Sequence, residues 1–254
     1  MIDDYREIAD APLLRERGLF VAEGRFVVRR VIVDPHYTIH SLLLNDAAHR
    51  DLGDLLGRLP AGTPIHIRPP DEIAAVTGFK FHRGCLALVY RPPAAPLDSI
   101  LDAPSPIVLL EDVANPDNVG GVFRNAAAFG AGGIIVSPGC CDPLYRKAVR
   151  TSMGAVLRVP YARPDDWRSA IESVRRRGLA LVALTPRQPS ELLGEFAQRA
   201  RTMKVALALG SEGAGVSETV GELADAHVTI PIAGDVDSLN LAVAAGIALF
   251  ALRS

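Results

Sequence analysis

The sequence contains only three cysteines, three lysines and one tryptophan, and it has no hydrophobic run long enough to cross a bilayer. The cysteines, Cys85, Cys140 and Cys141, are odd in number, include an adjacent pair and form no C-x-x-C motif. This pattern argues against a disulfide framework and against a zinc site, and it fits a reducing cytoplasm. The longest apolar run, near 239–252, contains Asn240 and is shorter than the ~20 residues that span a membrane. The polar, acidic N-terminus does not resemble a signal peptide, so we expect a cytoplasmic protein that binds no membrane.

Charge is nearly balanced, with 27 basic and 29 acidic residues and a formal net charge of −2. This balance gives no overall signature of nucleic-acid binding, but it leaves room for a local basic face. Between Arg124 and Arg177 ten basic residues stand against four acidic ones, and such a local excess suits a phosphate backbone. Most of the basic residues are arginines, which genomic base composition explains, although the guanidinium group also suits phosphate recognition.

Proline divides the chain into two parts. The stretch 91–106 contains five prolines, a density typical of a semi-rigid extended linker, and it predicts a domain boundary. We expect a small α/β domain over 1–95 and a larger domain over 107–254. In the small domain the pattern of 26–33 fits either a helix or a strand, because periodicity does not decide between them. The other elements predicted there are strands at 41–44, 64–67 and 85–90 and helices at 46–59 and 71–76.

The larger domain alternates apolar runs with helical segments. Near-continuous apolar runs indicate strands buried on both faces, and their alternation with helices predicts a doubly wound α/β domain with a parallel sheet. In such sheets ligands bind beyond the carboxyl ends of the strands, so chemistry is expected in the loops after Leu110, Leu209 and Ile232. The predicted strands are 107–110, 133–136, 179–184, 205–209 and 227–232, and the predicted helices lie near 119–129, 145–153, 165–177, 192–202, 216–223 and 239–252.

The first of these loops leads into a helix and reads EDVANPDNVGGVFRN over 111–125. Asn118 is a suitable N-cap for that helix. Gly120 and Gly121 cost about 1 kcal/mol each relative to alanine, so close approach by another backbone or by a ligand explains them. Arg124 stands on an otherwise apolar helix and has to reach a carboxylate, a phosphate or solvent, with a surface salt bridge as the ordinary alternative.

The second loop, 209–216, reads LGSEGAGV and also follows a buried strand. It fits neither the P-loop pattern nor G-x-G-x-x-G. Its backbone and the carboxylate of Glu212 can hydrogen-bond a ligand. The alternative is a tight turn in which Glu212 caps the next helix.

The third stretch, 230–250, reads IPIAGDVDSLNLAVAAGIALF. Ser238 is a good N-cap for the helix rich in Ala and Leu that follows the loop. Asn240 has no packing reason to interrupt an apolar stretch, because a buried amide without partners costs about 1–3 kcal/mol. A strand, a Gly-containing loop and a helix N-terminus together suit a small polar ligand, although an ordinary strand–loop–helix connection has the same pattern.

In this order, each after a buried strand, the three loops resemble the signature motifs of the SpoU (TrmH-like) branch of the SPOUT RNA methyltransferases. The matches are N-x-G-x-x-x-R-[NT] at 118–125, G-S-E-G-x-G at 210–215 and I-P-I-x-G-x-x-x-S-L-N at 230–240. VRTSMG at 149–154 resembles the connecting segment of the family, and FVAEG at 20–24 resembles part of the small substrate-binding domain of many members.

The resemblance implies a deep trefoil knot in the parallel-sheet domain and a small N-terminal L30e-like α/β domain that binds RNA. It implies methyl transfer from S-adenosylmethionine to a ribose 2′-hydroxyl of structured RNA, and a homodimer formed through the C-terminal domain. The separate N-terminal domain favours ribosomal RNA over transfer RNA as the substrate. The alternatives are a catalytically silent RNA-binding protein with the same fold and an enzyme acting on free nucleotides. Ala242, where the family commonly has serine, is given no role.

The family's functional residues carry over onto this sequence in two groups. Arg124 is expected to position or deprotonate the ribose hydroxyl, and Asn118, Glu212, Ser238 and Asn240 are expected to shape the site around it. The chemistry requires no metal. The residues expected to hold the cofactor are Leu209, Gly210, Gly213, Ile230, Ile232 and Leu239.

RNA contacts are expected on two basic stretches. Aromatic and basic residues alternate over 79–84, offering stacking faces and phosphate partners, while an edge strand with one apolar face explains the pattern equally well. The second stretch, near 146–150, lies closer to the motifs. The residues expected to bind RNA are Lys80, His82, Arg83, Arg146, Lys147 and Arg150.

Overall fold

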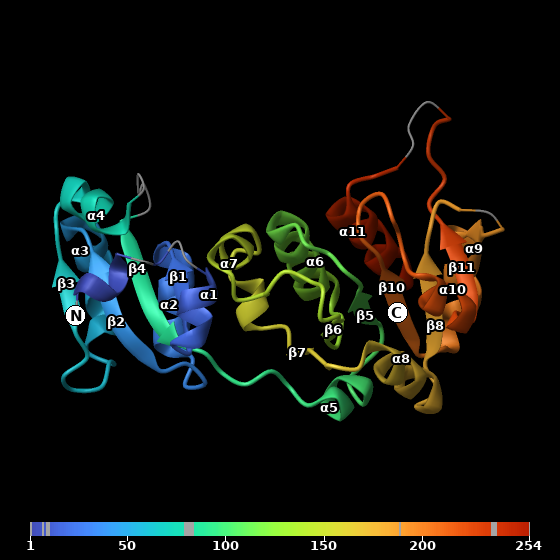
Figure 1. The fold of residues 1–254 in the computed structure, drawn as a ribbon, viewed down its shortest axis with the longest axis horizontal. Helices are drawn as coiled ribbons and strands as arrows, with labels where there is room; N and C mark the ends of the chain where they lie inside the picture. Colours follow the sequence, from blue (N-terminus) through green and yellow to red (C-terminus); the bar gives the residue numbers. More distant parts are fainter. Residues whose placement is uncertain are drawn as a thin grey trace. The chain divides into compact units, whose positions relative to one another are not determined.

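The computed structural model contains two compact units, each assembled from more than one stretch of chain (Figure 1). The first comprises Met1–Pro93 and Leu144–Gly154, and the second comprises Ala94–Pro143 and Ala155–Ser254. Leu144–Gly154 therefore packs with the first unit although it lies late in the sequence, and the predicted domains 1–95 and 107–254 stay predictions. The structure describes residues 2–6, 8, 11–78, 84–187, 189–234 and 238–253.

The first unit is built on a mixed four-stranded sheet. Its strands are β1 (Leu19–Glu23), β2 (Ile39–Leu44), β3 (Ile65–Ile67) and β4 (Cys85–Tyr90). They lie in the order β1-β4-β2-β3, where β4 is antiparallel to both neighbours and β3 is parallel to β2. All five residues of β1 are buried, because both of its faces are covered. The three strands predicted in this part of the chain are confirmed.

The segment 26–33 is helical, which settles the choice that its pattern left open. Gly24 ends β1 with a φ of 93°, a conformation that residues with a Cβ rarely adopt, and the helix starts directly after it. The helices predicted at 46–59 and 71–76 are also present. The helices of this unit are the 3-10 helix η1 (Ile2–Tyr5), α1 (Ala11–Glu16), α2 (Arg25–Val33), α3 (Asp46–Leu56), α4 (Pro70–Thr77) and α7 (Arg146–Thr151).

The second unit contains a seven-stranded sheet in the order β7-β6-β5-β10-β8-β11-β9, and every pair of neighbouring strands is parallel. This confirms the predicted α/β fold with a parallel sheet. The last predicted strand is too long, because β11 ends at Thr229 and Pro231 lacks the N–H that a ladder needs. The strands are β5 (Ile107–Leu110), β6 (Ile134–Val136), β7 (Tyr161–Ala162), β8 (Ala180–Leu184), β9 (Glu191–Leu192), β10 (Val205–Leu209) and β11 (Ala226–Thr229).

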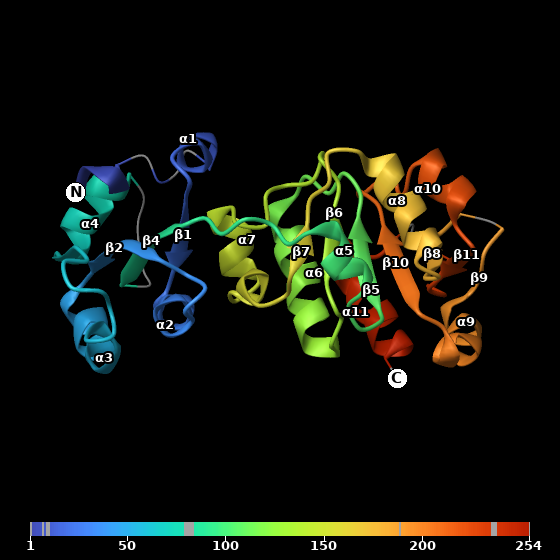
Figure 2. The same ribbon diagram turned by 90° about the horizontal axis from the view of Figure 1, so that it is seen from below.

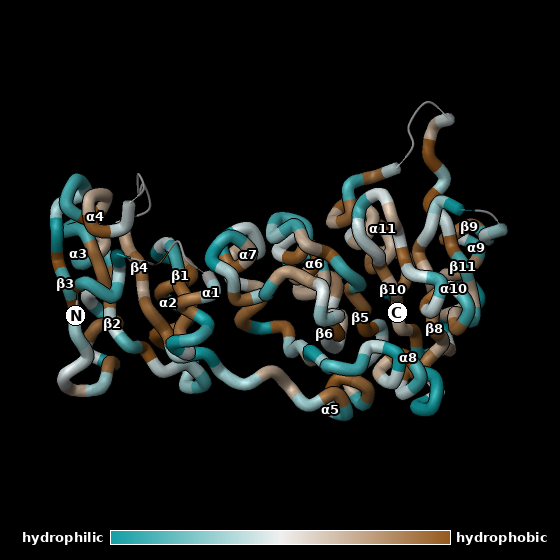
Figure 3. Tube along the Cα trace, viewed as in Figure 1, coloured by the Kyte–Doolittle hydropathy of each residue, from teal (hydrophilic) through white to brown (hydrophobic). Residues whose placement is uncertain are grey.

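Helices cover both faces of this sheet. Figure 2 shows α8 and α10 on one side and α6, α9 and α11 on the other. The strands are mostly in the hydrophobic colours of Figure 3, as burial on both faces requires. The elements are α5 (Leu97–Leu101), α6 (Pro116–Phe129), the 3-10 helix η2 (Ala155–Leu157), α8 (Trp167–Arg176), α9 (Leu193–Arg199), the 3-10 helix η3 (Ala200–Thr202), α10 (Glu218–Leu223) and α11 (Leu241–Leu252).

The prediction of an extended linker over 91–106 is wrong for Leu97–Leu101, which form α5. Ile100 and Leu101 are buried against the sheet, with exposed fractions of 0% and 2%. The apolar area that they remove from water favours a helix there, although the flanking prolines indicate extended chain. Among the described residues, no helix is long and apolar enough to cross a membrane.

Two predicted helix caps are wrong by a few residues. Asn115, rather than Asn118, caps α6, and Pro116 occupies the first helical position, where a missing N–H costs nothing. Asn240, rather than Ser238, caps α11. In both helices the capping side chain is the one directly before the first turn, where its oxygen reaches the unpaired N–H groups.

Candidate cofactor pocket and active site

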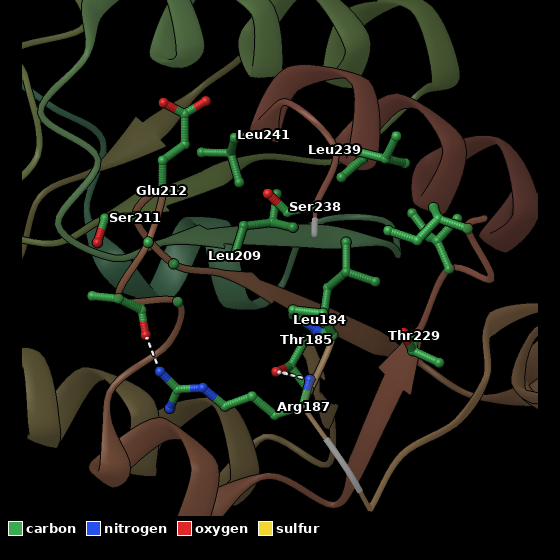
Figure 4. Close-up of a pocket in the computed structure, with 18 residues that line it drawn as sticks. Leu184, Thr185, Arg187, Leu209, Ser211, Glu212, Thr229, Ser238, Leu239 and Leu241 are labelled. Atoms are coloured by element: carbon green, nitrogen blue, oxygen red, sulfur yellow. Dashed lines mark hydrogen bonds between the residues drawn. The ribbon is translucent and has the colours of Figure 1, made fainter. Parts of the chain in front are cut away.

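A cavity of about 300 Å³ lies in the second unit, where the loops that follow β8, β10 and β11 meet. Figure 4 shows Arg187 on one side and Leu239 and Leu241 on the other, with Leu184 and Leu209 between them. Aliphatic side chains and the backbone of the Gly-rich loop thus form much of its wall. All six residues expected to hold the cofactor line it: Leu209, Gly210, Gly213, Ile230, Ile232 and Leu239.

The Gly-rich loop, defined here as residues 210–216, folds back on itself. A Cβ on Gly210 would lie 1.9 Å from the carbonyl of Gly215, so only glycine fits there. The N–H of Gly215 donates to the carbonyl of Ser211 at 2.9 Å, and Gly213 and Gly215 have φ values of 88° and 72°. The loop therefore depends on glycine for both its close approach and its backbone angles.

Asn240 joins the three predicted motifs. Its side-chain N–H groups donate to the side-chain amide oxygen Oδ1 of Asn118 at 2.9 Å and to the carboxylate of Glu212 at 3.1 Å. Its own oxygen accepts from the backbone N–H groups of Ala242 and Val243 at 3.0 and 3.3 Å. The amide thus has partners on both ends, which explains a polar residue in this apolar stretch.

Glu212 does not cap the next helix, because Ser217 is the N-cap of α10. The carboxylate instead reaches Asn240, and the residue is exposed at the edge of the cavity. Ser238 is also exposed and lines the cavity. Three of the predicted catalytic residues, Asn118, Glu212 and Asn240, therefore meet in one hydrogen-bonded cluster beside a pocket that contains a fourth.

Arg124 lies apart from that cluster on α6 and is exposed. Within the described part of the chain, no carboxylate pairs with it and no hydrogen bond joins it to Asn118, Glu212 or Asn240. The ordinary alternative, a surface salt bridge, is thus not seen among these residues. Its guanidinium remains accessible to a partner from solution.

Helices α6 and α11 pack closely behind the cluster. A Cβ on Gly121 would lie 2.5 Å from the Cβ of Ala242, so α11 approaches α6 at the glycine. Close approach by another backbone or by a ligand was the predicted reason for Gly121, and the group that approaches is the side chain of Ala242. On the same contact, Asn125 donates a side-chain N–H to the carbonyl of Ala242, and Gly246 leaves room for the Asn125 side chain.

Sequence reasoning missed Glu111, which follows β5 and is only 4% exposed. Its carboxylate accepts hydrogen bonds from the Trp167 indole at 2.6 Å and from both the N–H and the hydroxyl of Ser217 at 2.7 Å. The sequence did offer a signal for Glu111, because a carboxylate directly after a four-residue apolar strand is expected to be buried. A buried carboxylate needs hydrogen-bond donors.

The loop after β8 was also missed. Thr185 and Arg187 line the cavity, and Arg187 donates from its side chain to the carbonyl of Ala214 in the Gly-rich loop at 2.7 Å. Its backbone N–H donates to the hydroxyl of Thr185 at 3.1 Å. The rule that ligands bind at the carboxyl ends of parallel strands applies to β8 as well, so this loop was open to prediction.

In the first unit, Arg146 and Arg150 of α7 both face Glu23 at the end of β1. The distances from their guanidinium nitrogens to the carboxylate are 2.8 and 3.9 Å, and Glu23 is 4% exposed. The expected RNA contacts of these two residues, and of Lys147 beside them, stay predictions. Lys80, His82 and Arg83 lie outside the described residues.

Burial raises the pKa of the Tyr5 phenol and of the three thiols. Burial raises the pKa of Cys85 to about 12 and that of Cys141 to about 11, so both stay protonated near neutral pH. Over the described ranges, no group of three or more His, Cys, Asp or Glu side chains is arranged to hold a metal ion.

A parallel sheet with a cavity and three polar loops at its strand ends defines an α/β protein with a ligand site in the usual position for this architecture. Residues 105–250 match the model of the SpoU rRNA Methylase family. The match covers more than half of the chain, and the chain belongs to this family.

Relatives and solved structures of the same family resemble nearly the whole chain. An uncharacterized tRNA/rRNA methyltransferase of Mycobacterium tuberculosis is 34% identical over 98% of this chain and 87% of the relative. A crystal structure of an AdoMet-bound rRNA methyltransferase from Sinorhizobium meliloti superimposes with a TM-score of 0.83 at 27% identity, covering 99% of this chain and 93% of that one. The SpoU methyltransferase AviRb from Streptomyces viridochromogenes, in complex with AdoMet, gives 0.82 at 25% identity over 99% and 96%.

Proposed function

We propose that the protein transfers a methyl group from S-adenosylmethionine to a ribose 2′-hydroxyl in structured RNA, with ribosomal RNA preferred over transfer RNA. The observation that carries this proposal is the cluster of Asn118, Glu212 and Asn240 beside the cavity, because three separate motifs converge there. The similarity to an AdoMet-bound rRNA methyltransferase and to the AdoMet-bound SpoU methyltransferase AviRb supports the cofactor, and the first of them supports the substrate class.

The residues of the cavity suit this cofactor. Leu184, Leu209 and Leu239 offer aliphatic surface to a flat base, and the Gly-rich loop offers backbone groups to its polar edges. Among the described residues, chain neighbours aside, no atom lies within 4 Å of the place where a Cβ would stand on Gly213 or Gly215, so this backbone faces open space.

When bound, S-adenosylmethionine supplies a methyl group on a positively charged sulfur. A ribose hydroxyl is a weak nucleophile and has to lose its proton during the attack. A guanidinium group is a poor base, so we assign Arg124 positioning of the hydroxyl and the adjacent phosphate through its fork of N–H groups. The Asn118–Glu212–Asn240 cluster holds the loops that border the reacting groups, which keeps them preorganised.

The first experiment incubates the purified protein with S-adenosylmethionine and separate pools of unmodified ribosomal and transfer RNA. Mass spectrometry of the digested RNA then identifies methylated nucleosides. We expect 2′-O-methylated nucleosides, with more in the ribosomal pool. Cofactor binding with RNA binding but no methylated product in either pool would favour the alternative, a catalytically silent RNA-binding protein.

We also propose that the second unit is knotted and that the first is an RNA-binding domain of the L30e-like type. The packing of α11 against α6 and the link from Asn240 to Asn118 support the knot, because they hold the end of the chain against a much earlier loop. Mechanical stretching from both ends tests it, since a tightened knot leaves the unfolded chain shorter than its full contour. A chain beginning at Ala94, where the second unit starts, is expected to bind cofactor but not structured RNA.

A homodimer formed through the second unit is proposed as well. Val243, Ile247 and Phe250 form a stripe along α11 and are 51%, 39% and 54% exposed. Large apolar side chains in a row are typical of surfaces that a partner covers. Sedimentation of the wild type and of Ile247→Glu should give a dimer and a monomer, and a monomeric wild type would contradict the proposal.

A further inference from the structure

The carboxyl group of Glu111 is buried and has no cationic partner among the described residues. It is 4% exposed, and none of the described lysine, arginine or histidine side chains forms an ion pair with it. Neutral donors compensate it instead, through three contacts of 2.6–2.7 Å. Such short bonds to a charged acceptor are stronger than bonds between neutral groups, so this arrangement constrains the donors as firmly as it stabilises the carboxylate.

Two of those donors belong to Ser217, the residue that follows the Gly-rich loop. The backbone N–H and the hydroxyl of Ser217 both donate to the Glu111 carboxylate. The same hydroxyl oxygen accepts the N–H of Val220 at 3.2 Å and so caps α10. The hydroxyl hydrogen points at Glu111 while its lone pair faces the helix, which leaves Ser217 one orientation.

The backbone of Glu111 holds the other end of the same loop. Its N–H donates to the carbonyl of Leu209, the residue that precedes the Gly-rich loop, at 2.9 Å. One residue therefore binds the chain on both sides of 210–216. The loop lines the cavity between these two anchors.

We infer that Glu111 is a positioning residue for cofactor binding, because it fixes both ends of the Gly-rich loop in the shape that the cavity needs. The inference rests on the proposed function, since it takes the ligand of the cavity to be S-adenosylmethionine. A loop held in its binding conformation loses less entropy when the ligand binds, so Glu111 raises affinity without touching the ligand.

Trp167 makes this arrangement measurable. It is the only tryptophan in the sequence, and its indole N–H donates to the carboxylate oxygen that also accepts the Ser217 hydroxyl. Tryptophan fluorescence of the intact protein therefore comes from the one indole that donates to Glu111. We expect cofactor binding to change this emission in the wild type.

The test compares Glu111→Gln with the wild type by isothermal titration of S-adenosylmethionine, by Trp167 fluorescence and by steady-state kinetics. Gln keeps the size of the side chain but presents N–H groups to donors. We expect the Kd for S-adenosylmethionine to rise about 10- to 100-fold, as the loss of one or two bonds to a charged group implies. At saturating cofactor kcat should stay within about threefold, because the reacting groups are untouched. The fluorescence response should be lost.

Matched control variants distinguish an effect on the Gly-rich loop from a general loss of packing or of a helix cap. Trp167→Phe removes one bond to Glu111 but leaves both bonds to Ser217, so its Kd should stay close to that of the wild type. If Glu111→Gln fails to fold, Ser217→Ala replaces it, with Asp166→Ala as its control. Both variants lose a helix cap, but only Ser217 binds the Gly-rich loop to Glu111. Ser217→Ala should weaken cofactor binding and Asp166→Ala should not.

These experiments distinguish failure of the inference about Glu111 from failure of the proposed function. If the wild type binds S-adenosylmethionine and Glu111→Gln binds it within twofold, or if only kcat falls, the positioning role of Glu111 is wrong and the proposed function stands. Equal Kd values for Ser217→Ala and Asp166→Ala would overturn it in the same way. A folded wild type that does not bind S-adenosylmethionine overturns the proposed function instead.

Discussion

Each unit buries a glutamate at the end of a strand, and the carboxyl groups of the two glutamates have different kinds of partner. Glu23 ends β1, Glu111 follows β5, and both are 4% exposed. Glu23 faces two arginines of α7, whereas Glu111 accepts hydrogen bonds from neutral groups. A buried carboxylate needs compensation in either setting, and the choice of partner decides which other groups are committed to it.

The comparison bears on the arginines. Arg146 and Arg150 share the carboxylate of Glu23, so an RNA phosphate that binds them has to compete with it. Arg124 in the second unit is exposed and has no carboxylate partner among the described residues. Of these three arginines, Arg124 is the one that can bind a phosphate without giving up an ion pair seen among the described residues.

The largest expected effect is the loss of methylation rate when Arg124, the arginine without a carboxylate partner among the described residues, is replaced. Arg124→Ala should lower the rate of RNA methylation about 10²–10⁴-fold, because the hydroxyl loses the group that positions it. Cofactor affinity should not change, since Arg124 does not contribute to the lining of the cavity in the described structure. Single-turnover assays and calorimetry measure the two quantities. Arg201→Ala, another exposed arginine, serves as the control, and an Arg124→Ala enzyme as fast as wild type would disprove the role.

The next effect concerns the ion pair of the first unit. Glu23→Ala should lower the free energy of unfolding by about 3 kcal/mol, because it removes the buried carboxylate that Arg146 faces. Urea denaturation followed by circular dichroism measures it. The control is Glu72→Ala, which removes an exposed i,i+4 pair with Arg68 and should cost no more than about 0.5 kcal/mol. Equal costs for the two variants would mean that burial adds nothing to the Glu23 pair.

Two glycines in helices sharpen the contrast in packing. Gly121→Ala should destabilise the protein by about 1–3 kcal/mol, because its Cβ would meet Ala242 at 2.5 Å. Gly53 lies within α3, and nothing stands within 4 Å of its missing Cβ. Gly53→Ala should therefore stabilise by about 1 kcal/mol. Thermal unfolding of both variants gives the signs, and a stabilising Gly121→Ala would contradict the close approach of α6 and α11.

A further effect, measured as a slope against pH, is the pH dependence that the buried thiol of Cys85 confers. Cys85 in the first unit has a pKa of about 12 when folded, above the value of about 8.5 for an unfolded thiol. The folded state holds this proton more tightly, so the stabilisation is complete below pH ~8.5 and is lost as the pH rises toward 12. Between pH 9 and 10.5 the slope should be about 1.4 kcal/mol per pH unit for this thiol. Denaturation curves of Cys85→Ala should show a flatter dependence, and parallel curves would contradict the shift.

Local pattern was enough for the elements that local sequence controls. Continuous apolar runs predicted β5, β6, β8 and β10 because strands buried on both faces need them. Pattern did not decide whether 26–33 is helix or strand, and the turn at Gly24 settled it. Proline density misled at α5, where burial of Ile100 and Leu101 outweighs the local preference.

The candidate site was predictable as three motifs but not as a network. The sequence indicated Asn118, Glu212 and Asn240 one at a time, and only the packed chain shows that their side chains meet. Glu111 and Arg187 were missed because their partners, Ser217 and Ala214, are far away in sequence. No local pattern contains a contact between residues so far apart.

By itself, the sequence determined the parallel α/β class, most of the strands and the positions of the three polar loops. These follow from hydropathy and from glycine, which act over a few neighbouring residues. Tertiary structure alone decided which residues cap α6 and α11 and which groups contact the carboxylates of Glu23 and Glu111. It also decided that Leu144–Gly154 packs with the first unit. The physical reason is that a buried charge or amide is satisfied by whichever donor folding brings within about 3 Å, and that donor need not be near in sequence.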